Sequence, residues 1–198
     1  MMEGYLQSCI KQFRYYKMLG EKTFAQLSDD ALFFRSNEEC NSVAMIVAHL
    51  SGNMLSRWTE FLTSDGEKEW RNRDMEFSGG ITSRAAMMDA WNAGWDCLFA
   101  TLDQLTDSDM SRIVHIRNEG HTVFEAINRQ LAHYPYHIGQ IVHIGKTAIG
   151  TDWSSLSIPR NGSAEFNTTK FSQAPHRAHF TDGALDTATD SSSVPPGQ

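Results

Sequence analysis

Apolar side chains recur every three or four positions in four separate segments of this 198-residue chain. This spacing gathers them on one face of a helix, because an α-helix turns once in about 3.6 residues. The predicted helices cover residues 4–27, 43–63, 83–105 and 122–150. Four amphipathic helices must bury their apolar faces against one another, so we predict an all-α protein that folds as an antiparallel four-helix bundle.

A short β-hairpin is predicted just before the last helix. Residues 112–122 alternate apolar and polar side chains, which is the period of a strand, and a turn is expected at residues 118–120. Thr122 and Glu125 then have the spacing of a capping box, in which hydroxyl and carboxylate satisfy reciprocal backbone donors at a helix start. An isolated hairpin is only marginally stable, so this one must pack against the bundle.

The segment between the second and third predicted helices, residues 64–82, is polar and long. Loops of more than about 12–15 residues are uncommon in compact domains and are often functional. We therefore expect part of this loop to form a lid over one end of the bundle, with Trp70, Arg71, Arg73 and Phe77 in it. Because its cationic side chains are interleaved with carboxylates, a solvated surface of mixed charge is the competing interpretation.

The bundle is expected to occupy residues 1–160, and residues 161–198 to form an irregular C-terminal extension. Helical periodicity is lost beyond residue 151, and the last stretch consists mostly of Asp, Thr, Ser, Pro and Gly. Such residues bury too little apolar area to offset the entropy of ordering the backbone. Disorder is predicted from about residue 182.

Composition and charge argue against several classes of partner. The formal net charge is −7 and no cluster of Lys and Arg occurs, so nucleic acid is not an expected partner. No run of about 20 apolar residues is present, so no membrane span is expected, and no secretory signal is predicted. Cys9, Cys40 and Cys97 lack the paired spacing of a disulfide framework, which favours a reducing cytoplasm.

Three of the eight histidines are predicted to bind one divalent metal ion. His133 and His137 are four residues apart on the last helix, so both imidazoles point in the same direction. His49 lies in the middle of the second helix among apolar residues, where an imidazole without a partner would be costly to bury. Surface or hydrogen-bonded histidines are the alternative for the pair on the last helix, because their spacing alone is a weak signal.

Neighbouring residues favour the metal site. Pro135 removes one helical hydrogen bond between the two histidines and is expected to bend the helix there. Gln140 follows His137 by three residues and can supply an amide that orients the imidazole. His143 is six residues beyond His137, which turns it away from a shared ion.

On the second helix, Asn53 and Ser56 are expected to share the face of His49, with Arg57 flanking it. Asn53, Arg57 and Gln140 are the candidates for catalytic or substrate-orienting roles. Arg57 could hold a carboxylate through its planar guanidinium, or it could form a salt bridge to a loop carboxylate such as Asp65 or Asp74. We find no carboxylate in the sequence that is predicted to share the metal face as a general base.

Three segments resemble the DinB-like superfamily: HLSGNMLSRWTEFLT at residues 49–63, DGEKEWRNRD at 65–74 and HYPYHIGQI at 133–141. The resemblance covers about residues 1–160 and is closest to an uncharacterised bacterial subfamily. It implies an up-down-down-up four-helix bundle, often dimeric, in which three histidines bind zinc, nickel or a similar ion. By motif these are His49, His133 and His137, and the chain departs from the family through Pro135 and its long C-terminal extension.

The resemblance leaves two classes of function open. Some members of the superfamily are thiol S-transferases that use bacillithiol or mycothiol, and others are described only as metal-dependent hydrolases. Three neutral imidazoles would leave an ion with an open position for a small-molecule substrate, including a low-molecular-weight thiol, as in catalytic zinc sites. The alternative is a non-catalytic metal-binding stress-response bundle, which the missing general base favours.

Overall fold

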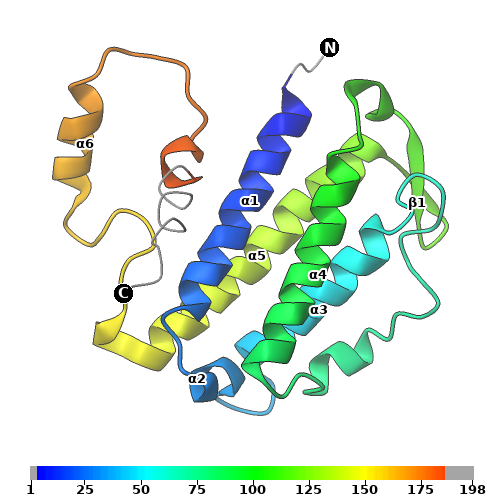
Figure 1. The fold of residues 1–198 in the computed structure, drawn as a ribbon, viewed down its shortest axis with the longest axis horizontal. Coiled ribbons are helices and arrows are strands. Elements are labelled where there is room, and N and C mark those ends of the chain that lie inside the picture. Colours follow the sequence, from blue (N-terminus) through cyan, green and yellow to red (C-terminus); the bar gives the residue numbers. More distant parts are fainter. Residues whose placement is uncertain (1–3, 186–198) are drawn as a thin grey trace, which may run out of the picture.

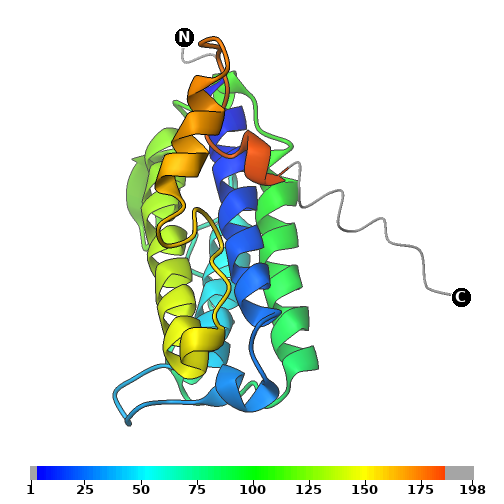
Figure 2. The ribbon, with the colours of Figure 1, turned by 90° about the vertical axis from the view of Figure 1, so that its left-hand side faces the viewer.

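The computed structural model describes residues 4–185. Within that range the protein is mostly helical and contains one two-stranded antiparallel hairpin, which precedes the last long helix as predicted. Figure 1 shows the long helices lying side by side, with the hairpin beside them near one end, and the view turned by 90° in Figure 2 agrees. None of the described helices has the length and apolar character needed to cross a membrane.

The long helices are α1 (Tyr5–Phe24), α3 (Val43–Trp58), α4 (Arg84–Leu102) and α5 (Val123–Ile149). The shorter elements are α2 (Asp29–Phe33), α6 (Ser163–Phe171), the 3-10 turns η1 (Asp74–Phe77), η2 (Asp107–Asp109) and η3 (Gly150–Asp152), and the strands β1 (Ile113–Ile116) and β2 (Glu119–Thr122). Side chains cap three of the long helices: Ser42, Ser83 and Thr122 each accept a backbone N–H, and Thr122 with Glu125 completes the predicted capping box.

One apolar core lies between the long helices, where α1 packs mainly on α5 and α3 mainly on α4. Its largest fully buried side chains include Trp58, Trp91, Trp95 and Tyr134. Trp91 and Trp95 belong to this core, since they are 1% and 0% exposed. Burial of each such aromatic ring removes a large apolar area from water, so these four residues contribute much of the stability of the fold.

The second predicted helix is shorter than expected. α3 ends at Trp58 rather than near residue 63, because Thr59 is extended and Glu60 has φ 49°, in the left-handed region. Apolar spacing continues through Phe61 and Leu62, so the pattern alone did not reveal the end of the helix. Phe61 still packs into the core, with its ring 4.8 Å from that of Trp58.

The predicted hairpin turn was misplaced. Strand pairing joins Ile116 to Glu119, so the turn consists of Arg117 and Asn118, with φ 56° and 63°. A two-residue hairpin turn of this kind needs positive φ at both positions. The carboxylate of Asp65 supports it by accepting the backbone N–H groups of Arg117 and Asn118, both at 2.8 Å. The long loop thereby fixes the hairpin, although the sequence offers a glycine one position further on.

Asp65→Asn is expected to weaken this anchor by about 1–2 kcal/mol. Burial raises the pKa of the Asp65 carboxyl, but hydrogen bonds from the backbone N–H groups of Asn118, Glu67 and Arg117 lower this pKa to about 2, below its ordinary value of 3.8. The stability that the ionised carboxylate contributes is therefore fully present above pH 3.8 and is lost as the pH falls through about 2.

Urea unfolding of both forms at about pH 7 and about pH 3 checks this, and the stability difference should be smaller at the lower pH. Asp96→Asn, an exposed change on α4, is the control. A difference between wild type and Asp65→Asn that is independent of pH would contradict the anchor.

The C-terminal extension contains more structure than the irregular segment that the sequence suggested. Residues 163–171 form α6, whose side chains are exposed throughout, and Figure 1 shows this helix standing apart from α1. The chain then returns to α1, where Asp182 pairs with Lys11 at 2.6 Å. His179 is half-buried, and its Nε2 lies 3.0 Å from Ser8 Oγ. Most of the segment predicted to be disordered, residues 186–198, lies outside the described residues.

Candidate metal centre

The three predicted histidines come together between α3 and α5. His49 Nε2 lies 3.4 Å from His133 Nε2, and His137 Nε2 lies 3.1 Å from the same atom. One ligand atom from each imidazole lies within 4.8 Å of the other two. Two helices that are far apart in the sequence therefore direct three ring nitrogens towards a common point, which is the arrangement that a metal ion requires.

A buried network holds α3 and α5 in register beside this cluster. Trp58 on α3 donates its indole N–H to the Tyr134 hydroxyl at 3.0 Å, and that hydroxyl donates to Asn53 Oδ1 at 3.1 Å. Tyr134 directly follows His133 on α5. The network therefore fixes the position of His133 and His137 along the helix axis relative to His49. Asn53, a candidate for orienting substrate, is thus used to join the two helices. α5 is one unbroken helix that continues through Pro135.

Each histidine has a hydrogen-bond acceptor on the side away from the cluster. His49 Nδ1 lies 2.8 Å from Glu76 Oε2, His133 Nδ1 lies 3.2 Å from Gln130 Oε1, and His137 Nδ1 lies 2.7 Å from Gln140 Oε1. A neutral imidazole carries one proton, and these acceptors place it on Nδ1 in all three rings. Each Nε2 therefore presents a lone pair to the common point, and Gln140 has the orienting role that its spacing predicted.

A positive charge on His133 or His137 is disfavoured. Burial, together with His137 and His49 close by, lowers the pKa of His133 to about 3. Burial also lowers the pKa of His137. Three neutral rings whose lone pairs face one another cannot satisfy each other by hydrogen bonding, whereas a divalent cation at the common point would satisfy all three. The donor set therefore fits a metal ion.

Glu76, which the sequence analysis did not single out, is the orienting partner of His49. Its carboxylate also accepts the Arg71 guanidinium, with Nε at 2.8 Å from Oε1 and Nη2 at 3.1 Å from Oε2. Although burial raises the pKa of Glu76, the hydrogen bonds from His49 and Arg71 lower it overall. Arg71, Glu76 and His49 thus form a hydrogen-bonded series in which the guanidinium pairs with the carboxylate and the carboxylate accepts from the imidazole. Carboxylate–histidine pairs orient metal ligands in many proteins.

The predicted lid is realised in part. Phe77 lies against His49, with ring centroids 5.0 Å apart, and Arg73 lies over Phe77 at 5.2 Å. The Arg71 side chain is only 2% exposed, so a solvated surface is the wrong interpretation for this residue. Trp70, however, is 59% exposed and points to solvent.

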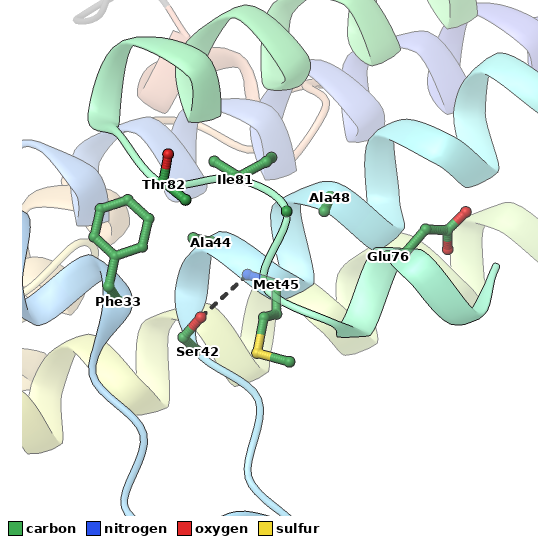
Figure 3. A pocket seen from close by; sticks show the side chains of 10 residues that line it. Phe33, Ser42, Ala44, Met45, Ala48, Glu76, Ile81 and Thr82 are labelled. Carbon is green, nitrogen blue, oxygen red and sulfur yellow. Dashed lines mark hydrogen bonds between the residues drawn. The ribbon is translucent and has the colours of Figure 1, made fainter. Parts of the chain in front are cut away.

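A small hollow of about 300 Å³ lies behind the lid, between the start of α3 and residues 79–82. Figure 3 shows Glu76 at one end of the hollow, with its carboxylate turned away from Phe33 and Thr82 at the other end. Because that carboxylate is directed to His49 and Arg71, the hollow borders the outer side of the site rather than the convergent Nε2 atoms.

Arg57 is directed towards the loop rather than a substrate. Its guanidinium donates to the Gly66 carbonyl and lies 3.3 Å from Glu67 Oε2, while Ser56 also donates to Gly66. Burial lowers the pKa of Arg57, which is 6% exposed. Arg57 therefore forms a salt bridge to a loop carboxylate, as one interpretation predicted, but the carboxylate is that of Glu67 instead of Asp65 or Asp74.

Other histidines lie outside the cluster. His143 is exposed, as its position on α5 predicted, and His121 at the end of β2 does not reach the site. The Nε2 atom of His121 is buried without a hydrogen-bond partner among the described residues.

Fold and site together define a helical protein with a candidate three-histidine metal centre. The chain belongs to the family described as protein of unknown function (DUF1572), whose model matches residues 1–162. No curated protein and no solved structure matches the chain. The family region includes the three histidines and Glu76, and it ends just before α6.

Glu76→Gln is expected to weaken metal binding about 10–100-fold, because an amide orients His49 less strongly and leaves Arg71 without its carboxylate. Competition for Zn²⁺ against a chromogenic chelator measures this. Glu69→Gln, an exposed change in the same loop, is the matched control and should leave the affinity unchanged. Equal affinities for the two variants would mean that Glu76 does not position a ligand.

Proposed function

We propose that this chain is a DinB-like four-helix bundle that binds one divalent ion, such as zinc or nickel, through His49, His133 and His137. The convergence of three Nε2 atoms, each with its Nδ1 held by an outer acceptor, carries the proposal. The four long helices around one apolar core, together with the resemblance in residues 49–63 and 133–141, support the assignment of the fold.

Three imidazoles from the protein are the ligand number of catalytic rather than structural zinc sites, which keep a further position open. A bound divalent ion would lower the pKa of water or of a thiol at that position and so supply a nucleophile near neutral pH. Outer residues of the chain would hold the three rings in place. Glu76, which is itself paired with Arg71, would hold His49. Gln130 would hold His133, and Gln140, which also donates to the Tyr136 hydroxyl, would hold His137.

The reaction classes that suit such a site are hydrolysis and transfer to or from a thiol. His133 and His137 are half-buried, so part of each of these residues is accessible to solvent, whereas His49 is only 5% exposed. We propose a metal-dependent hydrolase or thiol S-transferase acting on a small-molecule substrate.

A second candidate is a non-catalytic metal-binding protein that acts in stress response. It is favoured by the position of Glu76, whose carboxylate contacts the cluster on the Nδ1 side of His49. In that position the carboxylate orients a ligand and is already paired with Arg71, so it does not face the convergent Nε2 atoms as a general base would.

An activity screen separates the two candidates. Metal-loaded protein is assayed against uncharged esters and amides, and against low-molecular-weight thiols with electrophilic acceptors, with His133→Ala as the control. Turnover by wild-type protein that the control lacks supports the enzyme. Stoichiometric metal binding without turnover on any panel supports the non-catalytic protein.

Two further properties belong to this proposal. The resemblance implies a homodimer, which sedimentation velocity of the purified protein tests, since a purely monomeric boundary would contradict it. A cytoplasmic location is supported by the three cysteines, which are all free in the structure.

A further inference from the structure

A hollow of about 610 Å³ lies between one flank of α5, the first turn of α3 and the segment that joins α2 to α3. Its size is typical of small-molecule sites. It is lined by Phe34, Ser36, Glu39, Cys40, Asn41 and Ile46 on one side and by Tyr136, Gly139, Gln140, His143, Ile144 and Thr147 of α5 on the other.

This hollow begins where the candidate metal centre ends. Gln140 lines it and also accepts from His137 Nδ1 at 2.7 Å. Tyr136 lines it too, receives the Gln140 amide N–H at 3.2 Å, and has its ring 5.0 Å from that of His137. On α3, Ile46 lies one turn before His49. The hollow therefore runs from the outer, Nδ1 side of His137 towards the C-terminal end of α5, and none of the three cluster histidines lines it.

Its walls are poor in positive charge. No Lys or Arg lines the hollow among residues 4–185, whereas the Glu39 carboxylate does. Arg35 lies in the same segment, but its guanidinium donates to the backbone carbonyls of Glu38 and Cys40. An anionic ligand in this hollow would give up part of its hydration beside the Glu39 carboxylate, with no Lys or Arg in the walls to pair with, which is costly.

The remaining lining suits an uncharged molecule with an apolar body. Phe34 and Tyr136 are large side chains that remain 53% and 63% exposed, and Ile46 and Ile144 lie further in. Asn41 and Gln140 supply neutral polar groups that can fix orientation. We propose that this hollow binds an uncharged, mainly apolar small molecule next to the metal centre. The inference goes beyond the proposed function and does not depend on the metal ion.

A matched pair of fluorescent probes tests the charge selectivity on the metal-loaded full-length protein. N-phenyl-1-naphthylamine is uncharged, and 8-anilinonaphthalene-1-sulfonate has the same rings with a sulfonate. The uncharged probe should bind at one site per chain, and the anionic probe about tenfold more weakly or worse. Equal or tighter binding of the sulfonate would overturn the proposal.

Gly139 provides a means of filling the hollow. A Cβ added there meets nothing within 4 Å, so Gly139→Leu extends into the hollow without a backbone clash and also improves helix propensity. It should weaken binding of the uncharged probe about tenfold. Ala93→Leu, an exposed change on α4, is the matched control and should bind the probe as wild type does.

Thr147→Phe is a second filling variant on the same flank of α5, should Gly139→Leu fail to fold by circular dichroism. Unchanged probe binding in whichever filling variant folds would place the probe elsewhere and overturn the proposal. Metal content is measured on every sample, so failure of the metal centre is distinguishable: a protein that binds the uncharged probe in this hollow but retains no Zn²⁺ refutes the proposed function and not the hollow.

Discussion

His137→Ala is expected to abolish stoichiometric binding of a divalent ion while leaving the far-UV circular dichroism almost unchanged. Without His137, two Nε2 atoms remain, and Gln140 loses the ring that it orients. Loss of an outer partner alone costs about 10–100-fold in metal affinity, so loss of a direct ligand should cost more. The helix should persist because alanine is the better helix former and the side chain of His137 is only half-buried.

Elemental analysis after extensive dialysis gives the metal content of this variant. His143→Ala is the matched control, because it removes an exposed histidine from the same helix and should retain the ion. A full complement of metal in His137→Ala, or equal losses in both variants, would be incompatible with the site.

Trp95→Ala is expected to give the largest loss of stability, about 3–5 kcal/mol, through the apolar contacts removed and the cavity left behind. Trp95 is fully buried, and its ring lies 5.4 Å from that of Trp91 and 5.9 Å from that of Tyr134. Its indole N–H is buried without a hydrogen-bond partner among the described residues, so loss of that group should not add to the cost. Urea unfolding followed by tryptophan fluorescence and circular dichroism measures the change.

Trp70→Ala is the control for residue type, since Trp70 is 59% exposed on the loop and should change stability by about 0.5 kcal/mol or less. If the two tryptophan variants lost similar stability, the packing of Trp95 between α4 and α5 would not be the source of the effect.

The long helices were predictable because their apolar spacing and capping residues agree. Ser42, Ser83 and Thr122 begin helices as their side chains allow. The end of α3 was not predictable, because the apolar pattern continues past a residue with positive φ, Glu60. α6 was missed for the opposite reason: its side chains are exposed, so no apolar stripe marks it.

The three histidines could be singled out because helical geometry converts spacing into direction. His133 and His137 had to share a face of α5, and the buried position of His49 required a partner. Glu76 lies in a loop, where no periodicity relates sequence to direction, and it reaches His49 from 27 positions away. The lid hypothesis indicated the right segment and named Arg71, but the carboxylate between Arg71 and His49 could be found only from the structure.

Elemental analysis of wild-type protein, purified without a histidine tag and dialysed after exposure to Zn²⁺, tests the metal centre most directly. We predict close to one zinc ion per chain, falling to background when His49 is replaced by alanine. Wild-type protein that retains no zinc, nickel or other divalent ion under these conditions would contradict the account.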